Sequence, residues 1–338
     1  MVNNILITGA CGFIGHHLIE YLLENTNDNI IIVDKLSYAS FGLERLREIN
    51  VINNERVRTN IFDLNSKFDE GYIYELQDVN IIIHLAAETH VDNSIRDPTD
   101  CILNNVQSTV NILELARKLK LDKFLYFSTD EVYGPALDNT DFSETSRHNP
   151  TNPYSASKSA SEMICNSYMN TYNIPLVICN VMNVYGERQH YEKFIPKCIQ
   201  NILHDKVNII HSYPLKNCEV PNAGSRFYIY AKDVASAINF ILTNGSVGEI
   251  YNIPGQIEIK NDDICEKIGK IMNKVPVKKY ADRDENRPGH DLRYALHGTK
   301  LFNMGWRHRY DFDNYLEKIV KWTLQNPNWL MPKTSQTT

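Results

Sequence analysis

Three closely spaced glycines near the N-terminus form a turn that is typical of parallel α/β sheets. Residues 5–18 read ILITGACGFIGHHL, which places Gly9, Gly12 and Gly15 between a short apolar run and an amphipathic one. Glycine at such a turn lets the backbone approach a pyrophosphate, and the free N–H groups of the following helix favour an anion. The spacing GxxGxxG is weak evidence alone, but a strand before it and a helix after it indicate a dinucleotide-binding turn.

A carboxylate follows the second apolar run of the chain. Asp34 lies 19 residues after Gly15, where it can bind a ribose 2′-OH and would repel a 2′-phosphate. We therefore expect NAD as the cofactor in preference to NADP, although Lys35 is adjacent. By the same reasoning Asp63 either lies near the adenine or is an ordinary loop residue. The predicted cofactor-binding residues are Gly9, Gly12, Phe13, Ile14, Gly15, Asp34, Asp63, Leu64, Ala86 and Lys158.

Apolar strands and amphipathic helices alternate along the first half of the chain. This order predicts an α/β fold with a Rossmann-type doubly wound parallel sheet and helices on both faces. Beyond Gly186 the alternation becomes irregular, which indicates a smaller C-terminal α/β domain for the substrate. The predicted division is residues 1–180 with a returning segment at about 224–254, then 181–223 and 255–330, and a flexible tail at 331–338. The main expected elements are strands Ile5–Thr8, Ile30–Val33, Val79–Ala86, Lys123–Ser128 and Leu176–Val181, and helices Phe13–Leu23, Asn105–Lys118, Pro153–Tyr172, Ile195–Leu203 and Ala231–Leu242.

Composition excludes several classes of protein. The 338 residues are 43% hydrophobic and 22% charged, with a net charge of -6 and no cluster of Lys and Arg, so nucleic acid is not an expected partner. No apolar run approaches the ~20 residues that span a bilayer, and the N-terminus does not resemble a signal peptide. We expect a cytoplasmic protein (in the host cytoplasm if the source is a virus) without a membrane partner. Seven cysteines without metal-ligand spacing predict reduced thiols and no metal site.

Two short patterns carry candidate catalytic residues. Tyr154 and Lys158, in NPYSASKSASE, project from one face of a predicted helix. A free tyrosine titrates near pH ~10, and an adjacent ammonium favours the phenolate, which makes the tyrosine a usable base near neutrality. Two exposed helix residues would give the same pattern, but the dinucleotide turn favours a catalytic pair. YFSTDEVYG places Thr129, Asp130 and Glu131 after an apolar run, either in a solvated turn or at the edge of the sheet.

Longer motifs resemble one enzyme family. The glycine turn, HLAAETHVDNS at residues 84–94, Thr129 and the Tyr154–Lys158 pair are similar to the extended short-chain dehydrogenase/reductases that act on nucleotide sugars. More narrowly, STDEVYG, NPYSASK, YGERQHYEKFIP and RPGHDLRY resemble the dTDP-glucose and UDP-glucose 4,6-dehydratases, over about residues 3–325. The resemblance extends to a giant-virus enzyme that acts on UDP-N-acetylglucosamine.

The resemblance implies a 4,6-dehydratase reaction with five catalytic residues. Tyr154, with Lys158 beside it, takes the proton of the sugar 4-OH, Thr129 hydrogen-bonds the same hydroxyl, and the C4 hydride passes to NAD. The C4 ketone acidifies C5, so that Glu131 can remove the C5 proton while a protonated Asp130 donates to the departing 6-OH. Return of the hydride to C6 and of a proton to C5 gives a 4-keto-6-deoxy sugar and regenerates the cofactor.

The same resemblance implies which residues bind the nucleotide sugar. Glu192 and Lys193 match a Glu-Lys pair near the sugar, although the preceding residue is not the family's proline. Asn183 matches an asparagine near the diphosphate, and Arg226 and Arg287 match arginines that hold phosphate. Without the family, a surface charge or a core histidine would explain each position as well. The predicted substrate-binding residues are His90, Asn183, Glu192, Lys193, Arg226, Arg287, His290 and Tyr294.

Other functions are compatible with the same fold. A nucleotide-sugar 4-epimerase or a decarboxylating synthase also needs Tyr154, Lys158 and NAD, but neither needs an acid to expel a 6-hydroxyl. Asp130 beside Glu131 therefore favours the dehydratase. A catalytically inactive NAD-binding regulator would have no reason to keep these four residues together.

Two segments depart from the family pattern near the sugar. The segment before RFYIY reads HSYPLKNCEVPNAGS, which is longer than the usual glycine-containing turn, and Met182 stands where a small or polar residue is common. These changes predict a reshaped sugar pocket. Because the overall pattern resembles the UDP-glucose dehydratases, we expect a UDP-linked substrate, with N-acetylglucosamine ahead of glucose. Inversion at C5 is expected if Lys193 returns the proton from the opposite face. UDP- or dTDP-glucose with retention at C5 stays open as the alternative.

The resemblance also implies a homodimer. The helices expected at residues 105–118 and 153–172 correspond to the family's bundle between subunits, so their outer faces should be more apolar than a monomer tolerates. The expected partners are therefore a nucleotide sugar and a second copy of the chain.

Overall fold

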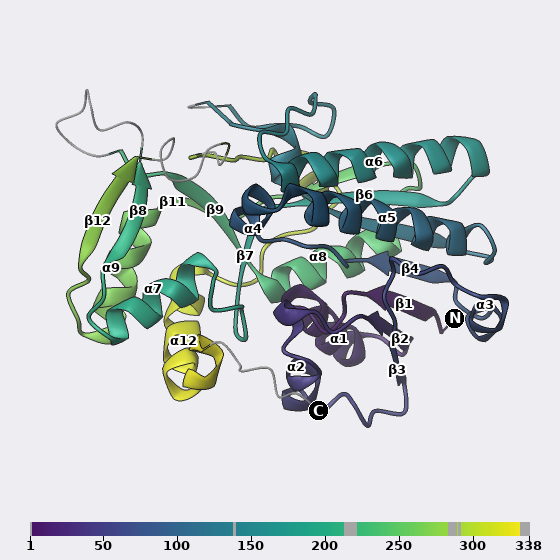
Figure 1. Ribbon diagram of the computed structural model, residues 1–338, viewed down its shortest axis with the longest axis horizontal. Helices are drawn as coiled ribbons and strands as arrows, with labels where there is room; N and C mark the ends of the chain where they lie inside the picture. Colours follow the sequence, from purple (N-terminus) through teal and green to yellow (C-terminus); the bar gives the residue numbers. More distant parts are fainter. Residues whose placement is uncertain (1, 138–139, 213–221, 283–288, 290–291, 332–338) are drawn as a thin grey trace.

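A seven-stranded parallel sheet is the centre of the molecule. The structure is a computed structural model that describes residues 2–137, 140–212, 222–282, 289 and 292–331. The sheet has the order β10-β6-β5-β4-β1-β2-β3 (Figure 1), which confirms the predicted doubly wound parallel sheet. Its strands are β1 (Asn4–Thr8), β2 (Asn29–Asp34), β3 (Val57–Ile61), β4 (Ile81–His84), β5 (Lys123–Thr129), β6 (Leu176–Val181) and β10 (Ile250–Ile253).

The direction in which strands are added to the sheet reverses between β1 and β4. From β1 the chain goes outward through β2 to β3, then returns to β4 on the other side of β1 and continues to β5 and β6. The ends of these strands meet at one edge, where Thr8 pairs with His84 and His84 with Tyr126. Sheets of this kind bind ligands beyond the carboxyl ends of the strands at such a reversal, so the topology places the site here.

Helices cover both faces of the sheet because its strands are apolar on both sides. The covering helices are α1 (Phe13–Asn25), α3 (Glu70–Glu75), α5 (Pro98–Ala116), α6 (Pro153–Tyr172), α8 (Ala231–Asn244) and α11 (Thr299–Asn303). Ile5 and Ile7 pack in the same core as α1 and α8, whereas Leu6 packs in the core of α5 and α6. Figure 1 shows α5 and α6 running side by side. Each large aliphatic side chain buried in this way contributes roughly 1.5–3 kcal/mol.

Short helical segments follow the strands at the carboxyl edge. The loop after β2 contains η1 (Tyr38–Ser40) and α2 (Glu44–Glu48), β4 is followed by α4 (Val91–Arg96), and β5 continues directly into η2 (Asp130–Tyr133). These segments supply side chains to the edge that the sheet topology assigns to ligands.

A smaller α/β lobe lies beside the large sheet, as Figure 1 shows. It contains a three-stranded sheet, β11-β9-β7, and a two-stranded sheet, β12-β8. Its own core joins Ile199, Ile264 and Leu316 from three helices. Between β9 and β11 the chain returns to the large sheet through α8 and β10. The elements of the lobe are β7 (Asn183–Tyr185), α7 (Phe194–Leu203), β8 (Asn208–Ser212), β9 (Ser225–Tyr230), β11 (Ile257–Lys260), α9 (Asn261–Met272), β12 (Lys278–Asp282), α12 (Phe312–Gln325) and η4 (Pro327–Leu330).

The expected elements are present, with one clear error at a helix start. The helix expected from Asn105 begins at Pro98, because the Asp97 side chain accepts a hydrogen bond from the Asp100 backbone N–H at 3.3 Å and caps it. Proline fits the first turn of a helix, so the sequence DPTD carried this signal. Helix Pro153–Tyr172 and strand Leu176–Val181 have the predicted bounds.

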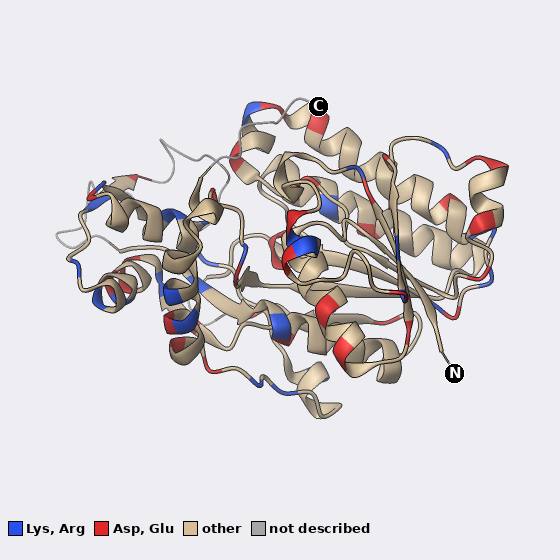
Figure 2. Cartoon of the chain, turned by 90° about the horizontal axis from the view of Figure 1, so that it is seen from below, with Lys and Arg blue, Asp and Glu red and all other residues tan. Residues whose placement is uncertain are grey.

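Several general expectations concern the whole described part of the chain. The positions of Lys, Arg, Asp and Glu are scattered along the ribbon (Figure 2). Among these residues no helix is long and apolar enough to cross a membrane, and no group of side chains could hold a metal ion. The cysteines there are free and buried. Residues 213–221, Arg287, His290 and the predicted tail from 332 lie outside the described residues.

Candidate active site

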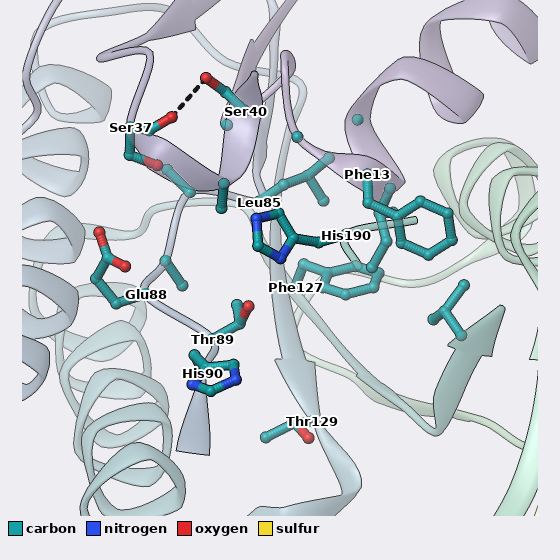
Figure 3. A pocket seen from close by; sticks show the side chains of 18 of the residues that line it. Phe13, Ser37, Ser40, Leu85, Glu88, Thr89, His90, Phe127, Thr129 and His190 are labelled. Atoms are coloured by element: carbon teal, nitrogen blue, oxygen red, sulfur yellow. Dashed lines mark hydrogen bonds between the residues drawn. The ribbon is translucent and has the colours of Figure 1, made fainter. Parts of the chain in front are cut away.

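One cavity at the carboxyl edge of the large sheet collects most predicted site residues. It extends from the glycine turn, past the ends of β4 and β5, to the start of α7 in the smaller lobe. Figure 3 shows Phe13, Glu88, His90 and Thr129 around it. The predicted site residues in its wall are Gly9, Gly12, Phe13, Ile14, Gly15, Asp34, Asp63, Leu64, Ala86, His90, Thr129, Asp130, Glu131, Tyr154, Lys158, Asn183, Glu192 and Lys193.

The glycine turn has the form that a pyrophosphate requires. A Cβ atom on Gly15 would lie 2.5 Å from the Cα of Ala10, and one on Gly9 would lie 2.7 Å from the backbone of Ala86. The approach at Gly15 holds the start of α1 against the turn, and the approach at Gly9 holds the turn against the segment after β4. Gly12 precedes α1 without a side chain that caps it, so the first N–H groups of the helix are available to an anion. The residues present therefore fit a dinucleotide.

Asp34 connects the glycine turn to the loop after β2. Its Oδ2 accepts a hydrogen bond from the Cys11 backbone N–H at 2.9 Å, and its Oδ1 accepts one from the Leu36 N–H at 2.8 Å. The adjacent Lys35 forms an ion pair with Glu88 at 3.3 Å. Because Glu88 already offsets this ammonium, Lys35 is poorly placed to attract a 2′-phosphate, which agrees with NAD.

Thr129, Asp130 and Glu131 lie where β5 ends and η2 begins. The Thr129 hydroxyl donates to Asp130 Oδ1 at 3.0 Å and accepts from the Glu131 N–H at 3.3 Å. Glu131 Oε2 accepts from Asn152 Nδ2 at 3.1 Å and from the Tyr294 hydroxyl at 3.4 Å. The three residues are therefore at the edge of the sheet and not in a solvated turn.

The surroundings of Asp130 keep its carboxyl group partly protonated near neutral pH. Its side chain is 4% exposed, and its Oδ2 has no hydrogen-bond partner in the described part of the chain. Burial, followed by the carboxylate of Glu131, raises the pKa of Asp130 to about 7. Arg226 and the Thr129 hydrogen bond act in the opposite direction. A large fraction of Asp130 is therefore protonated near neutrality.

Tyr154 and Lys158 enter the cavity from the first turns of α6. A capping box between Asn152 and Ser155 fixes this end of the helix, with the Ser155 N–H donating to Asn152 Oδ1 at 2.9 Å. Both catalytic candidates lie in the cavity wall and are buried. The predicted one-face arrangement is therefore present.

The expected phenolate of Tyr154 is not favoured by the protein groups around it. Burial, and then the charge of Glu131, raise the pKa of Tyr154. Lys158 does not offset them, because its Nζ donates to the Phe127 carbonyl at 2.8 Å and lies 4.3 Å from the centroid of the Tyr126 ring. Burial also lowers the pKa of Lys158 to about 8. The sequence argument considered only the ammonium and not the neighbouring carboxylates.

A buried carboxylate behind Lys158 was missed by sequence reasoning. Glu162 lies one turn further along α6 and accepts a hydrogen bond from the Ser128 hydroxyl. Its Oε2 is 3.6 Å from His148 Nε2. Burial raises the pKa of Glu162 to about 7, and the charge of Lys158 opposes that shift. Its spacing of four residues from Lys158 was the available signal.

Glu192 lies between two imidazoles where the cavity reaches the smaller lobe. Its Oε2 is 3.5 Å from His90 Nε2 and 3.3 Å from His190 Nδ1. Lys193 Nζ donates to the Thr89 carbonyl at 3.1 Å, which joins the smaller lobe to the segment after β4. Burial lowers the pKa of His190 to about 4, so this ring is neutral. The sequence analysis did not single out His190.

Met182 and Asn183 follow β6 and line the cavity. Met182 is buried and packs with Val132, Tyr133 and Leu296. The Asn183 Nδ2 is buried and has no hydrogen-bond partner in the described residues. An unpaired buried amide costs free energy, so Asn183 is suited to bind a polar ligand.

Arg226 and Tyr294 are outside the cavity wall. Arg226 Nη1 donates to the carbonyls of Ser225 at 2.7 Å and Leu292 at 2.5 Å, and its guanidinium lies 4.7 Å from the centroid of the Tyr294 ring. The Tyr294 hydroxyl contacts the site by donating to Glu131 Oε2 at 3.4 Å. The two side chains therefore act on the carboxylate pair from outside the cavity, Arg226 through its charge on Asp130 and Tyr294 through its hydrogen bond to Glu131.

The wall also contains residues from the loop after β2 that the sequence analysis did not name. The position of this loop directly after Asp34 was the one sequence signal that it lies at the site, and no motif indicated Arg45. These residues are Ser37, Tyr38, Ala39, Ser40 and Arg45.

Comparison with known proteins assigns the family. The family model described as GDP-mannose 4,6 dehydratase matches residues 6–319. The chain belongs to this family of nucleotide-sugar 4,6-dehydratases. It is 36% identical to the dTDP-D-glucose 4,6-dehydratase of Dictyostelium discoideum over 97% of this chain and 83% of that protein. It is 35% identical to the dTDP-glucose 4,6-dehydratase of Escherichia coli over 96% and 94%, respectively.

Solved structures agree with this membership. The dTDP-glucose 4,6-dehydratase of Streptomyces venezuelae, solved with NAD bound, has a TM-score of 0.85 and 32% identity, over 97% of this chain and 99% of that one. The UDP-glucuronic acid 4-epimerase of Bacillus cereus has a TM-score of 0.83 and 26% identity, over 96% and 99%. The predicted family, the dehydratase activity and the NAD cofactor are thereby confirmed.

Proposed function

We propose that Asp130 and Glu131 perform the elimination step of a 4,6-dehydratase that acts on a nucleoside diphosphate hexose. The observation that carries this assignment is the raised pKa of a buried Asp130 directly beside Glu131, in the wall shared with Tyr154 and Thr129. Two adjacent carboxyls with different protonation can act as acid and base on neighbouring atoms.

Each residue has one task in the proposed reaction. Tyr154 takes the proton of the 4-OH, and the Thr129 hydroxyl orients that oxygen. NAD supplies the acceptor and later the donor of the hydride. Glu131 removes the C5 proton, which the C4 ketone has acidified, and Asp130 protonates the 6-OH as water departs. Water must be excluded while the ketone exists, and the burial of Asp130 and Tyr154 favours that.

The experiment that tests these roles separates oxidation from elimination. We expect Asp130→Asn and Glu131→Gln to form NADH from bound NAD on mixing with substrate but to make little 4-keto-6-deoxy product, which is detected by its absorbance in alkali. If Asp130→Asn makes product at nearly the native rate, Asp130 is not the acid.

The identity of the hexose is a finer proposal. We propose glucose linked to dTDP or UDP, because relatives that match nearly the whole chain are dTDP-glucose 4,6-dehydratases. The sequence places UDP-N-acetylglucosamine ahead of glucose, on the basis of Met182 and the segment at residues 213–224, and we keep it as the second candidate. Met182 lies in the cavity wall, which keeps this candidate open, whereas most of that segment is outside the described residues.

A panel of four substrates decides between them. The native enzyme is mixed with UDP- and dTDP-linked glucose and N-acetylglucosamine, and kcat/KM is compared. A pocket built for the acetamido group should favour N-acetylglucosamine over glucose by a larger ratio of kcat/KM than the about 10- to 200-fold that one methylene group gives. A tenfold or greater preference for a glucose nucleotide supports glucose, and the reverse preference supports N-acetylglucosamine.

The configuration at C5 is decided by which group returns the proton. Glu131 as the only base predicts retention. Lys193 also lies in the cavity wall, and its return of the proton from the opposite face would give inversion. NMR of the product distinguishes the two, and Lys193→Met should abolish inversion alone if Lys193 is the second donor. Cytoplasmic location and the homodimer stay predictions of the sequence.

A further inference from the structure

Arg45 is a buried cation in the cofactor part of the cavity. It lies on α2, its side chain is 0% exposed, and it forms part of the cavity wall. Its Nη1 donates to the carbonyl of Cys11 at 3.2 Å and to those of Ala39 and Ser40 at 2.8 Å each. Its Nε donates to the carbonyl of Arg188 at 3.0 Å. The guanidinium therefore sits between the glycine turn and the loop after β2.

One end of this guanidinium has no partner. Its Nη2 is buried and makes no hydrogen bond to any described residue. No described carboxylate forms an ion pair with Arg45, whose flat faces instead lie 5.2 Å from the centroid of Phe41 and 5.1 Å from that of Trp329. Burial lowers the pKa of Arg45 to about 9, while Asp34 and Glu48 oppose this shift only from a distance. A buried charge of this kind favours an anionic ligand.

The other cations in the described cavity wall have different attachments. Lys35 pairs with Glu88, Lys158 donates to Phe127 beside the catalytic residues, and Lys193 donates to Thr89 where the cavity reaches the smaller lobe. Arg45 is the one of these cations that hydrogen-bonds to the glycine turn. That turn is where a pyrophosphate rests on the start of α1.

We propose that Arg45 Nη2 donates a hydrogen bond to the pyrophosphate of bound NAD. The negative charge of the pyrophosphate then supplies the counter-ion that the buried guanidinium lacks in the ligand-free protein. Arginine suits this task because its planar fork can bind the glycine turn and the loop after β2 with Nη1 and the Arg188 carbonyl with Nε, and still present Nη2. Arg45 is thus a positioning residue for the cofactor. The proposal rests on NAD binding and is independent of which sugar is the substrate.

The test compares ligands with and without a pyrophosphate. Protein stripped of NAD is titrated calorimetrically with ADP-ribose, which has the pyrophosphate, and with adenosine, which lacks it. We expect Arg45→Met to weaken ADP-ribose binding by about 10- to 100-fold and to change adenosine binding by less than about threefold. The salt dependence of ADP-ribose binding should also become weaker, because one ionic contact is lost.

A matched control and a milder variant keep the test sharp. Arg47 lies on the same helix and pairs with Glu44 at the surface, so Arg47→Met should leave both affinities unchanged. Arg45→Lys keeps the charge without the fork and should bind ADP-ribose with intermediate affinity. If Arg45→Met does not fold, this variant decides, together with an ADP-ribose-induced shift of an arginine Nε signal in ¹⁵N-labelled native protein.

Arg45 could instead act only as a structural clamp between the two lobes. In that case Arg45→Met and Arg45→Lys lose thermal stability, but the ratio of ADP-ribose to adenosine affinity stays at the native value. That outcome would overturn the proposal. Native NAD content and product formation in Arg47→Met serve as the check that the assay reports on intact enzyme.

Discussion

Asp130 shows how a single side chain acquires a function from its surroundings. An aspartate in water is ionised at neutral pH, but here burial and Glu131 raise its pKa to about 7. Thr129 donates to one of its oxygens at 3.0 Å, and the other has no hydrogen-bond partner among the described residues. An aspartate in a solvated turn would not have a raised pKa, because water would stabilise its ionised form.

The first prediction concerns the size of the catalytic effect. Asp130→Asn and Glu131→Gln should each lower the rate of product formation by ~10²- to 10⁴-fold, because each removes one positioned acid or base. Tyr154→Phe should lower C4 oxidation itself. Stopped-flow detection of NADH and of product measures both steps. Glu55→Gln, at an exposed loop position, is the control and should behave as native.

The second prediction follows from proton linkage at Asp130. The pKa of Asp130 in the folded protein lies above the ordinary 3.8. The folded state is therefore more stable at a pH where Asp130 is protonated than at a pH where it is ionised. That contribution is present below the unfolded pKa and is lost as the pH rises from about 4 to about 7. Asparagine imitates the protonated acid. Asp130→Asn should therefore have a higher Tm than native at about pH 8 and a similar Tm near pH 4.

Calorimetry at the two pH values measures this difference. If Asp130→Asn raises Tm equally at the two pH values, the pKa of Asp130 is not raised in the folded protein. Glu162 has a raised pKa as well and remains in both proteins, so its contribution cancels in the comparison. Arg226, Thr129 and Glu131, which face Asp130, are also unchanged.

At the scale of elements, the site is an assembly of strand ends. The glycine turn follows β1, β5 ends with Thr129, η2 supplies the carboxylate pair, and α6 supplies Tyr154 and Lys158. The elements can approach so closely because Gly15 has no side chain between α1 and the turn.

The third prediction tests this close approach. Gly15→Ala would place a Cβ atom 2.5 Å from the backbone of Ala10, which forces α1 away from the turn. We expect a loss of about 1–3 kcal/mol in stability and weaker NAD binding. Gly71→Ala in α3 is the control, since its Cβ would meet only Asp69 at 3.4 Å and alanine favours a helix. Thermal unfolding with and without NAD gives both quantities, and a Gly15→Ala protein that matches Gly71→Ala would refute the argument.

At the scale of the whole molecule, the surface of α5 and α6 includes large exposed apolar side chains. Leu103 on α5 is 61% exposed, and Met163 on α6 is 52% exposed. Tyr172, at the end of α6, is 44% exposed. Exposed apolar side chains on two neighbouring helices support the predicted homodimer.

The fourth prediction is that charges on this face separate the subunits. Leu103→Glu combined with Met163→Glu should shift the mass measured by light scattering at micromolar concentration from dimer to monomer. Val275, which is 91% exposed in the smaller lobe, gives the control Val275→Glu, which should stay dimeric. A native protein that is already monomeric under these conditions would contradict the predicted dimer.

Local sequence was sufficient for the fold class, the cofactor and the reaction class. The glycine turn, Asp34, the TDE triplet and the Tyr154–Lys158 spacing are short patterns, and each is set by the backbone geometry of one turn or helix. These patterns can therefore be interpreted without knowing which distant residues surround them. The start of α5 was placed too late only because the signal at Asp97 was not used.

Tertiary structure decided which distant residues meet and how they titrate. Arg45 reaches the glycine turn, His190 reaches Glu192, and Tyr294 reaches Glu131. These contacts depend on strand order and on how the smaller lobe packs against the large sheet, neither of which a local pattern records. The pKa values of Asp130, Tyr154 and Glu162 likewise follow from burial, because desolvation is set by every element that surrounds a group and not by its neighbours in sequence.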